Sequence, residues 1–407
     1  MSKIKTPLPL FDSLNNIKKC YSPSYLTSTQ QQDFVIAIDF IKNYIGSVGT
    51  FNSYRRDVER FLHWSWLIEK KNIKELKRDN IENFIRFCQS PPQSWVGTKK
   101  SPRFLDKEGK RTPNPEWRPF VVTISKTAYR TGERPVIKNF EFSQGAVKEL
   151  FAILSSFYNY LLQEEYVYMN PVALIRQKSK FIRKTQGKPK IRRLSELQWQ
   201  YVIKAAKQLA ESDANIHERT LFIMSALYSM YLRVSELTAS DRFTPKMNDF
   251  ARDSDGNWWF TTVGKGNKER QIAVSEAMIK ALKRWRKHLS LSPLPSAADN
   301  SSLLPRTKGT GPIKSTSYIR KIVQRCFNQA IEQLKQDNFH EEAQTLNEAT
   351  VHWLRHTGIS DDVKIRPREH VRDDAGHSSS ATTDKYINIE LRERHLSARK
   401  KPISEED

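Results

Sequence analysis

Six residues in the second half of the chain carry side chains that could act together on a phosphodiester. The guanidinium groups of Arg233 and Arg355 can hold phosphate oxygens in a fork and stay charged at any working pH. A tyrosine hydroxyl such as that of Tyr386 can attack phosphorus and keep the cleaved end covalently bound. In chain order the set is Arg233 in LRVSEL, Lys265 in VGKGNKER, His352 and Arg355 in VHWLRHTG, His377 in AGHSSS and Tyr386 in TTDKYINIE.

A phosphodiester requires positive charge around it because it is already anionic. Its transition state spreads further charge over the non-bridging oxygens. Arg233 and Arg355 could balance that charge, and neither an acidic cluster nor a CxxC pair accompanies them. We therefore expect a reaction that uses no metal ion and no other cofactor.

Each residue of the set also has an ordinary structural interpretation. Tyr386 is one of fourteen tyrosines, and Arg233 could cap a helix C-terminus, where cations are favoured. Lys265 could be an exposed turn residue with Lys268 as its rival, and His352 could be a buried core histidine. The order and spacing of all six, more than any single residue, favour the chemical interpretation.

In that order and spacing the segments resemble the tyrosine recombinases, also called the phage integrase family. The catalytic domains of this family present Arg, Lys, HxxR, His and a nucleophilic Tyr in the same order. The resemblance extends upstream, where TFNSYRRDVERFLHW, the segment 151–160 and YVYMNP are similar to the family's helical core-binding domain. It covers most of residues 47–390, while residues 91–140 fall outside the usual pattern.

The resemblance implies a role for each residue. Tyr386 would form a 3′-phosphotyrosyl link and release a 5′-hydroxyl, which attacks the partner strand. Lys265 matches the position of the family's general acid, and His352 and His377 would assist proton transfer and hydrogen-bond the scissile phosphate. The implied activity is site-specific DNA recombination or integration, independent of metal and ATP, as expected of a phage or other mobile genetic element or of chromosome resolution.

The resemblance also implies partners. We expect double-stranded DNA recombination sites, a homotetramer acting on two duplexes, and accessory factors that set direction. The tail 391–407 is amphipathic and charged, and in the family such tails are exchanged between protomers.

Two other functions remain open from the sequence. A type IB topoisomerase shares the Arg, Lys, Arg, His and Tyr chemistry but relaxes supercoils without a partner site. A degenerate, non-enzymatic DNA-binding protein would keep the fold without the reaction.

The segment 359–376 departs from the family pattern. The family has an apolar helix there, whereas this segment carries many charges and Pro367. Ala375 stands where leucine is usual, and Leu232 stands where glycine is frequent. This predicts an unusual local fold before His377 and a reduced or specialised activity.

Charge supports a polyanionic partner. Lys and Arg total 68 against 45 Asp and Glu, which gives a formal net charge of +23. The stretch 176–193 carries nine basic residues and no acidic one, so it is either a solvated linker or a segment that follows a phosphate backbone. The residues predicted to contact DNA are Arg55, Arg56, Arg176, Lys178, Lys180, Arg183, Lys184, Lys188, Lys190, Arg192, Arg193, Lys268 and Arg270.

Periodicity predicts a mainly α-helical fold with a small β-sheet or hairpin (α+β), organised as two domains that clamp DNA. We expect a polar, irregular extension over 1–30, a helical core-binding domain over 31–175, a basic linker over 176–193, a catalytic domain over 194–390 and the tail. Within the first domain, residues 91–140 are proline-rich and basic, and they form either a solvated hairpin-containing loop or a contact to the DNA backbone.

Apolar spacing and caps mark the elements that must position the six residues. We expect the following: helices from Gln31, over 54–62, over 78–88 and over 147–161; a helix capped by Ser195 and Gln198; an apolar helix over 221–232 that ends at Arg233; a hairpin over 258–274; a helix from Ser275 to His288; and a helix over 319–334. His352 and Arg355 would share one helix face, with His356 pointing elsewhere.

The rest of the composition excludes several classes of protein, namely disordered, membrane-spanning, secreted and disulfide-rich ones. Hydrophobic residues make up 38 %, which is enough for ordinary cores. The longest apolar stretch, 222–232, is below the ~18 residues of a spanning helix, and the N-terminus lacks the apolar core of a secretory signal. Three scattered cysteines give no disulfide framework. We expect a cytoplasmic protein with no membrane partner, associated with the nucleoid when bound to DNA.

Overall fold

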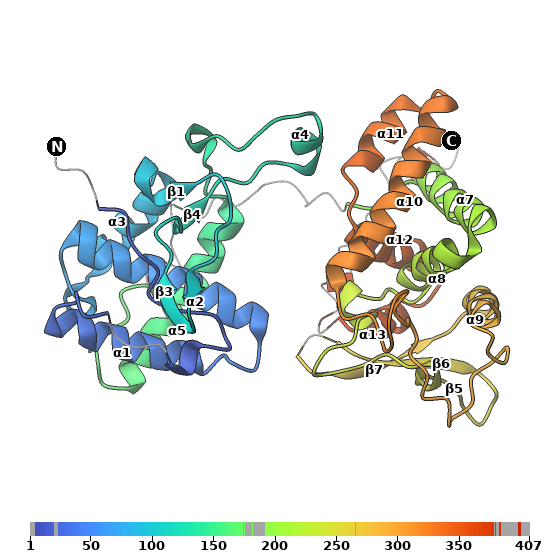
Figure 1. Cartoon of the computed structure of the whole chain (residues 1–407), viewed down its shortest axis with the longest axis horizontal. Coiled ribbons are helices and arrows are strands. Elements are labelled where there is room, and N and C mark those ends of the chain that lie inside the picture. The colour runs from blue at the N-terminus through green and yellow to red at the C-terminus, as the bar shows by residue number, and fades with distance from the viewer. Residues whose placement is uncertain are drawn as a thin grey trace, which may run out of the picture. The chain divides into compact units, whose positions relative to one another are not determined.

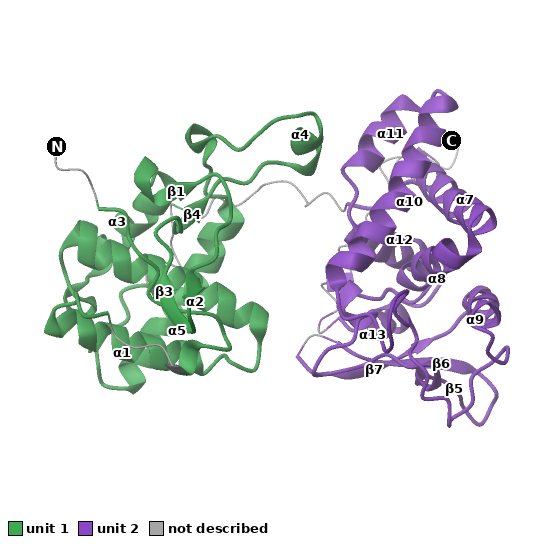
Figure 2. Ribbon diagram, in the orientation of Figure 1, with its two compact units in different colours: residues 1–188 green, residues 189–407 purple. Residues whose placement is uncertain are grey.

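The computed structural model describes residues 5–19, 23–173, 175, 181, 192–264, 266–377, 379, 382–383 and 398–399. The chain divides into two compact units, 1–188 and 189–407 (Figure 2). Both are mainly helical and contain small sheets, as the periodicity predicts (Figure 1).

The helices of the first unit pack around an aromatic core. Phe40 contacts Phe157 at a ring distance of 5.0 Å, and Phe61 contacts Phe84 at 5.1 Å, so rings from four helices meet in one core. The predicted helix over 78–88 and the predicted helix over 147–161 are both confirmed within two or three residues at each end. The helices are α1 (Ser28–Lys42), α2 (Val48–Trp64), α3 (Arg78–Gln89), α4 (Lys126–Arg130) and α5 (Gln144–Gln163).

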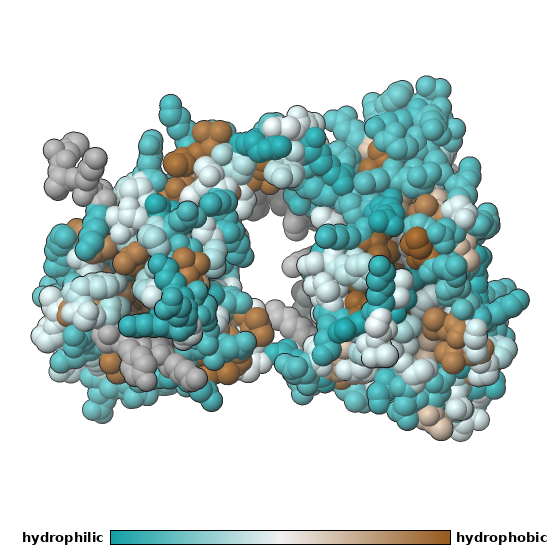
Figure 3. Space-filling model, in the orientation of Figure 1, coloured by the Kyte–Doolittle hydropathy of each residue, from teal (hydrophilic) through white to brown (hydrophobic). Residues whose placement is uncertain are grey.

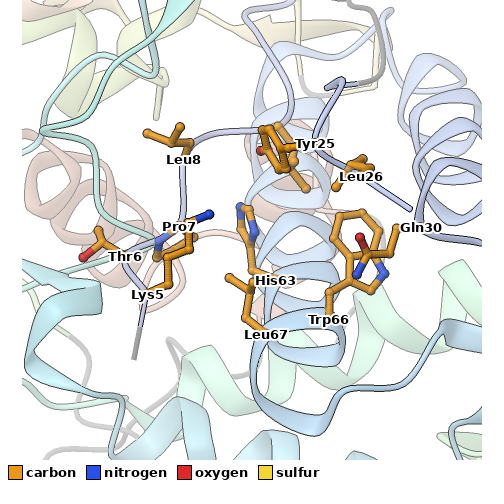
Figure 4. Close-up of a pocket in the computed structure, with 11 residues that line it drawn as sticks. Lys5, Thr6, Pro7, Leu8, Tyr25, Leu26, Gln30, His63, Trp66 and Leu67 are labelled. Carbon is orange, nitrogen blue, oxygen red and sulfur yellow. The ribbon is translucent and has the colours of Figure 1, made fainter. Parts of the chain in front are cut away.

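The N-terminal segment before α1 was predicted to be a polar extension, and this is wrong for its apolar residues. Leu10 and Phe11 are buried, and their backbone N–H groups donate to the buried carboxylate of Glu59 on α2, at 2.6 and 3.2 Å. Lys5, Thr6, Pro7 and Leu8 line a pocket of about 260 Å³ together with side chains of α1 and α2 (Figure 4). The segment has no helical period, so its burial rests on contacts distant in sequence that periodicity does not reveal.

Residues 91–140 are partly core and partly hairpin. Trp95, Trp117 and Phe120 are buried, and Arg60 of α2 stacks on Phe120 with 4.4 Å between guanidinium and ring centroid. The predicted hairpin is confirmed as the antiparallel pair β2–β3, closed by two residues with positive φ, Glu108 and Gly109. The strands are β1 (Val96–Gly97), which pairs in parallel with β4 (Phe120–Val121), and β2 (Phe104–Lys107) with β3 (Lys110–Pro113).

The second unit surrounds a largely aliphatic core with helices and one antiparallel sheet of order β5-β6-β7. Ser195 and Ser275 cap the helices that follow them, and the hairpin over 258–274 forms, all as predicted. The elements are α7 (Glu196–Ser212), α8 (Ala214–Ser229), β5 (Phe250–Arg252), β6 (Trp258–Val263), β7 (Glu269–Ala273), α9 (Glu276–His288), α10 (Thr316–Gln336), α11 (His340–Asn347), α12 (Val351–Asp362) and α13 (Arg368–Ala375).

The apolar helix α8 ends at Ser229, three residues earlier than predicted, so Arg233 does not lie on it. Tyr231 has φ of +49°, a left-handed conformation that ends the helical path. The residues after it remain buried, because Leu232 packs into the core of the unit. Burial therefore extended the apolar pattern beyond the helix itself.

Helix α12 crosses the end of α8 at Gly358, where a side chain has no room. A Cβ on Gly358 would lie 2.1 Å from the carbonyl oxygen of Tyr228. We expect Gly358→Ala to lower the free energy of unfolding of the second unit by about 1–3 kcal/mol or more, as overpacking does. Denaturant unfolding monitored by tryptophan fluorescence measures this.

The matched control is Gly49→Ala in α2, where nothing lies within 4 Å of an added Cβ. Alanine there should stabilise by about 0.5–1 kcal/mol because it favours the helix. Equal stability of Gly358→Ala and the natural chain would contradict the close crossing.

Among the described residues, no helix is long and apolar enough to cross a bilayer. The visible faces of both units are mostly hydrophilic, and the apolar side chains on them form scattered small patches (Figure 3).

Candidate active site

Arg355 is the centre of the site. Its side chain is buried on α12, with 2 % of the residue exposed. One Nη donates to the backbone carbonyl of Tyr231, and the other lies 2.5 Å from the carbonyl oxygen of Ala375 and 3.3 Å from Nε2 of His377. The guanidinium thus joins the end of α8 to the end of α13 and faces His377 directly.

His377 follows Gly376, whose φ of +63° ends α13. Its Nδ1 lies 2.9 Å from the hydroxyl of buried Thr383. Because a guanidinium can only donate, the contact with Arg355 requires Nε2 of His377 to be the unprotonated nitrogen, so Nδ1–H donates to Thr383. Burial, with the charges of Arg355, Arg233 and Arg270, lowers the pKa of His377 to about 4, so the imidazole is neutral near pH 7.

Arg233 is held by a buried carboxylate. The carboxylate of Glu236 accepts one hydrogen bond from the backbone N–H of Arg233 at 2.8 Å and another from Nη1 of Arg233 at 3.1 Å. Arg270 on β7 donates to both oxygens of Glu236, at 2.8 and 2.9 Å. Burial alone would raise the pKa of Glu236, but the hydrogen bonds and charges of Arg270 and Arg233 lower it, so Glu236 stays ionised. Arg233 remains partly exposed, with 29 % of its side chain accessible.

The hairpin meets this cluster at Gly264, the residue before Lys265. A Cβ there would lie 3.0 Å from Nη1 of Arg270 and 3.6 Å from Nη1 of Arg233. Gly376 is equally close, since its Cβ would lie 2.8 Å from Cδ of Arg270. Glycine at both positions lets the hairpin and the end of α13 approach the two arginines.

His352 lies on α12 at the exposed edge of the site, and its ring is 4.4 Å from that of His356. His356 was predicted to point elsewhere, and this is wrong: four residues apart, the two rings share one helix face. Burial lowers the pKa of His352, and the charges of Arg355 and Arg233 add to the effect. Burial lowers the pKa of His356 to about 4, and the charges of His352, Arg355 and His377 add to this effect.

The low pKa values of His356 and His377 predict that the second unit loses stability in acid. An unfolded histidine has a pKa of about 6.5, whereas folded His356 and His377 have pKa values of about 4. Between those values the unfolded chain binds more protons, so stability is full above about pH 6.5 and falls as the pH drops toward 4. We expect the thermal unfolding midpoint to fall over this window, measured by differential scanning calorimetry from pH 7.5 to 4.5.

His356→Gln should flatten that decline, because glutamine does not titrate. His340→Gln, at an exposed position, is the control and should leave the fall of the unfolding midpoint with pH unchanged. A midpoint that is level from pH 6.5 to 4.5 would contradict the low pKa values.

Several predicted site residues lie outside the described residues: Lys265, Tyr386, Arg176, Lys178, Lys180, Arg183, Lys184, Lys188 and Lys190. Of the predicted DNA contacts that are described, Lys268 and Arg192 are exposed, and Arg193 lies 3.7 Å from Asp361.

Three of the residues predicted to contact DNA, Arg55, Arg56 and Arg270, have partners within their own unit. Arg270 has 9 % of its side chain exposed and binds Glu236 and the carbonyl of Asp374, so its donors are directed inward. Arg56 is paired with Asp57 at 2.7 Å, and Arg55 donates to the carbonyl of Asp12 at 2.5 Å. A guanidinium fixed in this way stabilises its own domain, and contact of these three arginines with DNA stays a prediction.

Two residues that organise the site were not predicted, Glu236 and Thr383. For Glu236 a signal existed: it stands three residues after Arg233, the spacing at which a glutamate reaches back to the first backbone N–H of a helical turn. Thr383 has no such local signal. In the part of the chain that the structure describes, no group of three or more His, Cys, Asp or Glu side chains could hold a metal ion.

Comparison with known proteins identifies relatives of the second unit and of the fold. Residues 192–392 match the model of the phage integrase family. The chain is 27 % identical over 262 residues to the tyrosine recombinase XerC of Caldanaerobacter subterraneus subsp. tengcongensis, covering 63 % of this chain and 62 % of that protein. It is 24 % identical over 269 residues to XerC of Treponema denticola, covering 61 % of this chain and 74 % of that protein.

Two solved structures share the fold. The XerH site-specific recombinase bound to palindromic difH substrate aligns with a TM-score of 0.54 and 15 % identity, over 95 % of this chain and 93 % of that one. The Tn1549 transposon integrase in complex with circular intermediate DNA aligns with a TM-score of 0.51 and 15 % identity, over 92 % and 99 %. These structures show the fold, and the matched family model shows that residues 192–392 belong to the phage integrase family, the tyrosine recombinases.

Proposed function

We propose that this protein is a site-specific DNA recombinase that cuts and rejoins strands through a 3′-phosphotyrosyl intermediate at Tyr386. The observation that carries the proposal is the pair of arginines in one cluster, Arg355 fixed by three groups and Arg233 fixed by Glu236. Two fixed, permanently charged guanidiniums are suited to the non-bridging oxygens of a phosphodiester.

The reaction proceeds in two matched halves. Tyr386 attacks the phosphorus, its proton passes to a neutral imidazole such as His352, and the bond to the 5′-oxygen breaks. Lys265 protonates that leaving oxygen, which yields a free 5′-hydroxyl. In the second half, the 5′-hydroxyl of a partner strand attacks the phosphotyrosine and the tyrosine leaves. Neutral His377 keeps Nε2 toward Arg355 in both halves, so it aids orientation without adding charge.

The partner is double-stranded DNA, and the net charge of +23 favours it. Recombination joins two duplexes, so the working unit in this proposal is a tetramer with exchanged tails, and accessory factors set its direction. Association with the nucleoid follows from DNA binding. Of the proteins that share the fold, XerH was solved bound to palindromic difH substrate and the Tn1549 integrase in complex with circular intermediate DNA.

Deleting the tail from residue 391 onward tests the tetramer. The deletion keeps Tyr386, and it should weaken assembly of several protomers on DNA more than binding of the first protomer, because exchange links protomers. Mobility-shift titration separates the two steps. Equal loss at both steps would contradict tail exchange.

A recombination selection tests the function as a whole. Two libraries of randomised duplexes with different flanking sequences are incubated together with the protein, and hybrid molecules carrying one flank of each are amplified and sequenced. The proposal predicts hybrids with a shared core sequence. Relaxation of an arbitrary supercoiled plasmid without hybrids would indicate a type IB topoisomerase, and binding with neither activity would indicate a DNA-binding protein.

A further inference from the structure

Side chains of the charged segment 359–376, which departs from the family's apolar pattern, form a partly buried network of hydrogen bonds and ion pairs that reaches Tyr231 and Ala273. We propose that the ion pair of Arg366 with Asp374 in this segment is a positioning pair, which locks Arg355 and the hairpin in one geometry for cleavage. The inference rests on the proposed function and names residues that hold the catalytic groups without contacting DNA.

The first branch of the network leads to Arg355. Tyr231 is buried in a left-handed conformation, with φ of +49°, and its carbonyl accepts a hydrogen bond from Arg355. Its hydroxyl donates to Asp362 and accepts from Nη1 of Arg366 at 2.9 Å. The side chain of Tyr231 therefore fixes a backbone conformation that tyrosine rarely adopts, and the carbonyl that holds Arg355 is fixed with it.

The second branch leads to the hairpin. Nη2 of Arg366 lies 2.6 Å from Oδ2 of Asp374, and Oδ1 of Asp374 accepts the backbone N–H of Ala273 on β7 at 3.2 Å. The backbone carbonyl of Asp374 accepts Nε of Arg270 at 3.0 Å, and Arg270 in turn holds Glu236. Strand β7 therefore contacts Asp374 twice, and it carries Arg270, which binds the Glu236 carboxylate that holds Arg233.

The two branches meet at Arg366 because its guanidinium has two Nη groups that donate in different directions. One nitrogen serves Tyr231 and Asp362, and the other serves Asp374. A guanidinium offers such separated, planar donors, whereas a lysine ammonium is a single point charge. The pair is also sheltered, since only 8 % of the Asp374 side chain and 28 % of the Arg366 side chain are exposed. The geometry of both site arginines thus converges on one ion pair.

Helix α13 also provides a matched control pair. Arg372 contacts its neighbour Asp373 at 2.8 Å, and the Asp373 side chain is 67 % exposed. An exposed pair of this kind contributes little to stability. Arg372→Met and Asp373→Asn remove charge from the same helix without removing any contact to Tyr231, Ala273 or Arg270 that the structure records.

The test is single-turnover formation of the covalent DNA adduct by the full chain, at saturating DNA, on nicked duplexes selected with the natural protein. The variants are Arg366→Met, Arg366→Lys, Asp374→Asn and Tyr231→Phe, beside the two controls. DNA dissociation constants and unfolding midpoints are measured on the same samples. Misplacing reacting groups by about 1 Å costs on the order of 100-fold in rate, so we expect a 10- to 100-fold slower adduct with an unchanged DNA dissociation constant.

The outcomes are distinct. A positioning role predicts slow adduct formation by Arg366→Met and Asp374→Asn, incomplete rescue by Arg366→Lys, and natural rates for both controls. A natural rate in the folded variants would overturn the proposal, as would an equal slowing of the controls. If Arg366→Met does not fold, Tyr231→Phe, which lacks one hydroxyl, decides in the same way. No adduct from the natural protein would refute the proposed function instead.

Discussion

Replacing Tyr386 by phenylalanine is expected to abolish covalent attachment to DNA. Phenylalanine keeps the ring and loses only the hydroxyl that would attack phosphorus, so no phosphotyrosyl bond can form. DNA affinity should stay within about twofold, because affinity comes mainly from phosphate contacts of the basic residues. The measurement is denaturing electrophoresis of protein mixed with labelled, nicked duplexes drawn from a randomised library.

Tyr168→Phe is the control for this change. Tyr168 is 98 % exposed and belongs to the first unit, whereas the described site residues belong to the second. It should form the adduct at the natural rate. An adduct that survives Tyr386→Phe would mean that another tyrosine is the nucleophile.

Replacing Arg355 by lysine is expected to reduce the cleavage rate by about 10²- to 10³-fold, the range seen when one donor to a transition-state oxyanion is removed. Lysine keeps the charge but cannot bind the carbonyls of Tyr231 and Ala375 and face His377 together. The loss should therefore come from geometry as well as from the missing fork. Single-turnover rates on trapped substrates measure it.

Arg320→Lys on the exposed side of α10 is the matched control, and it should cleave at the natural rate. Unfolding midpoints of both variants separate lost stability from lost chemistry, since a buried arginine also supports the fold. A natural cleavage rate in folded Arg355→Lys would contradict the assignment of Arg355 to the phosphate.

Local signals predicted most of the elements that carry the site. Ser195 and Ser275 cap helices where the sequence places them, and the hairpin of β6 and β7 forms around its glycine-containing turn. These features depend on residues within a few positions of one another. Their physical causes, hydrogen bonds of caps and turn conformations, are therefore visible in a short stretch of sequence.

What could not be predicted depends on contacts distant in sequence. Arg270 carries the charge of a DNA contact, but 34 residues away Glu236 takes both of its Nη groups. Leu10 and Phe11 have no helical period, and the carboxylate that receives their N–H groups is almost 50 residues further on. The charges of the segment before His377 pair with one another and also contact Tyr231 and Ala273 on other elements, so an unusual sequence forms a partly buried network.

His356 is a different case, because its signal was local. Its spacing of four residues from His352 on one helix places both rings together, and burial, with the charges of His352, Arg355 and His377, lowers its pKa to about 4. A motif defined only by His352 and Arg355 leaves it out.

The most direct test of the central claim is to identify the amino acid that becomes linked to DNA. The natural protein is incubated with the nicked randomised library, denatured and digested with protease and nuclease, and the nucleotide-bearing peptide is sequenced by mass spectrometry. The proposal predicts a 3′-phosphate on Tyr386 in the peptide containing TTDKYINIE, and trapped DNA that shares one sequence. A nucleotide on any other residue, or tight binding with no linked peptide, would contradict it.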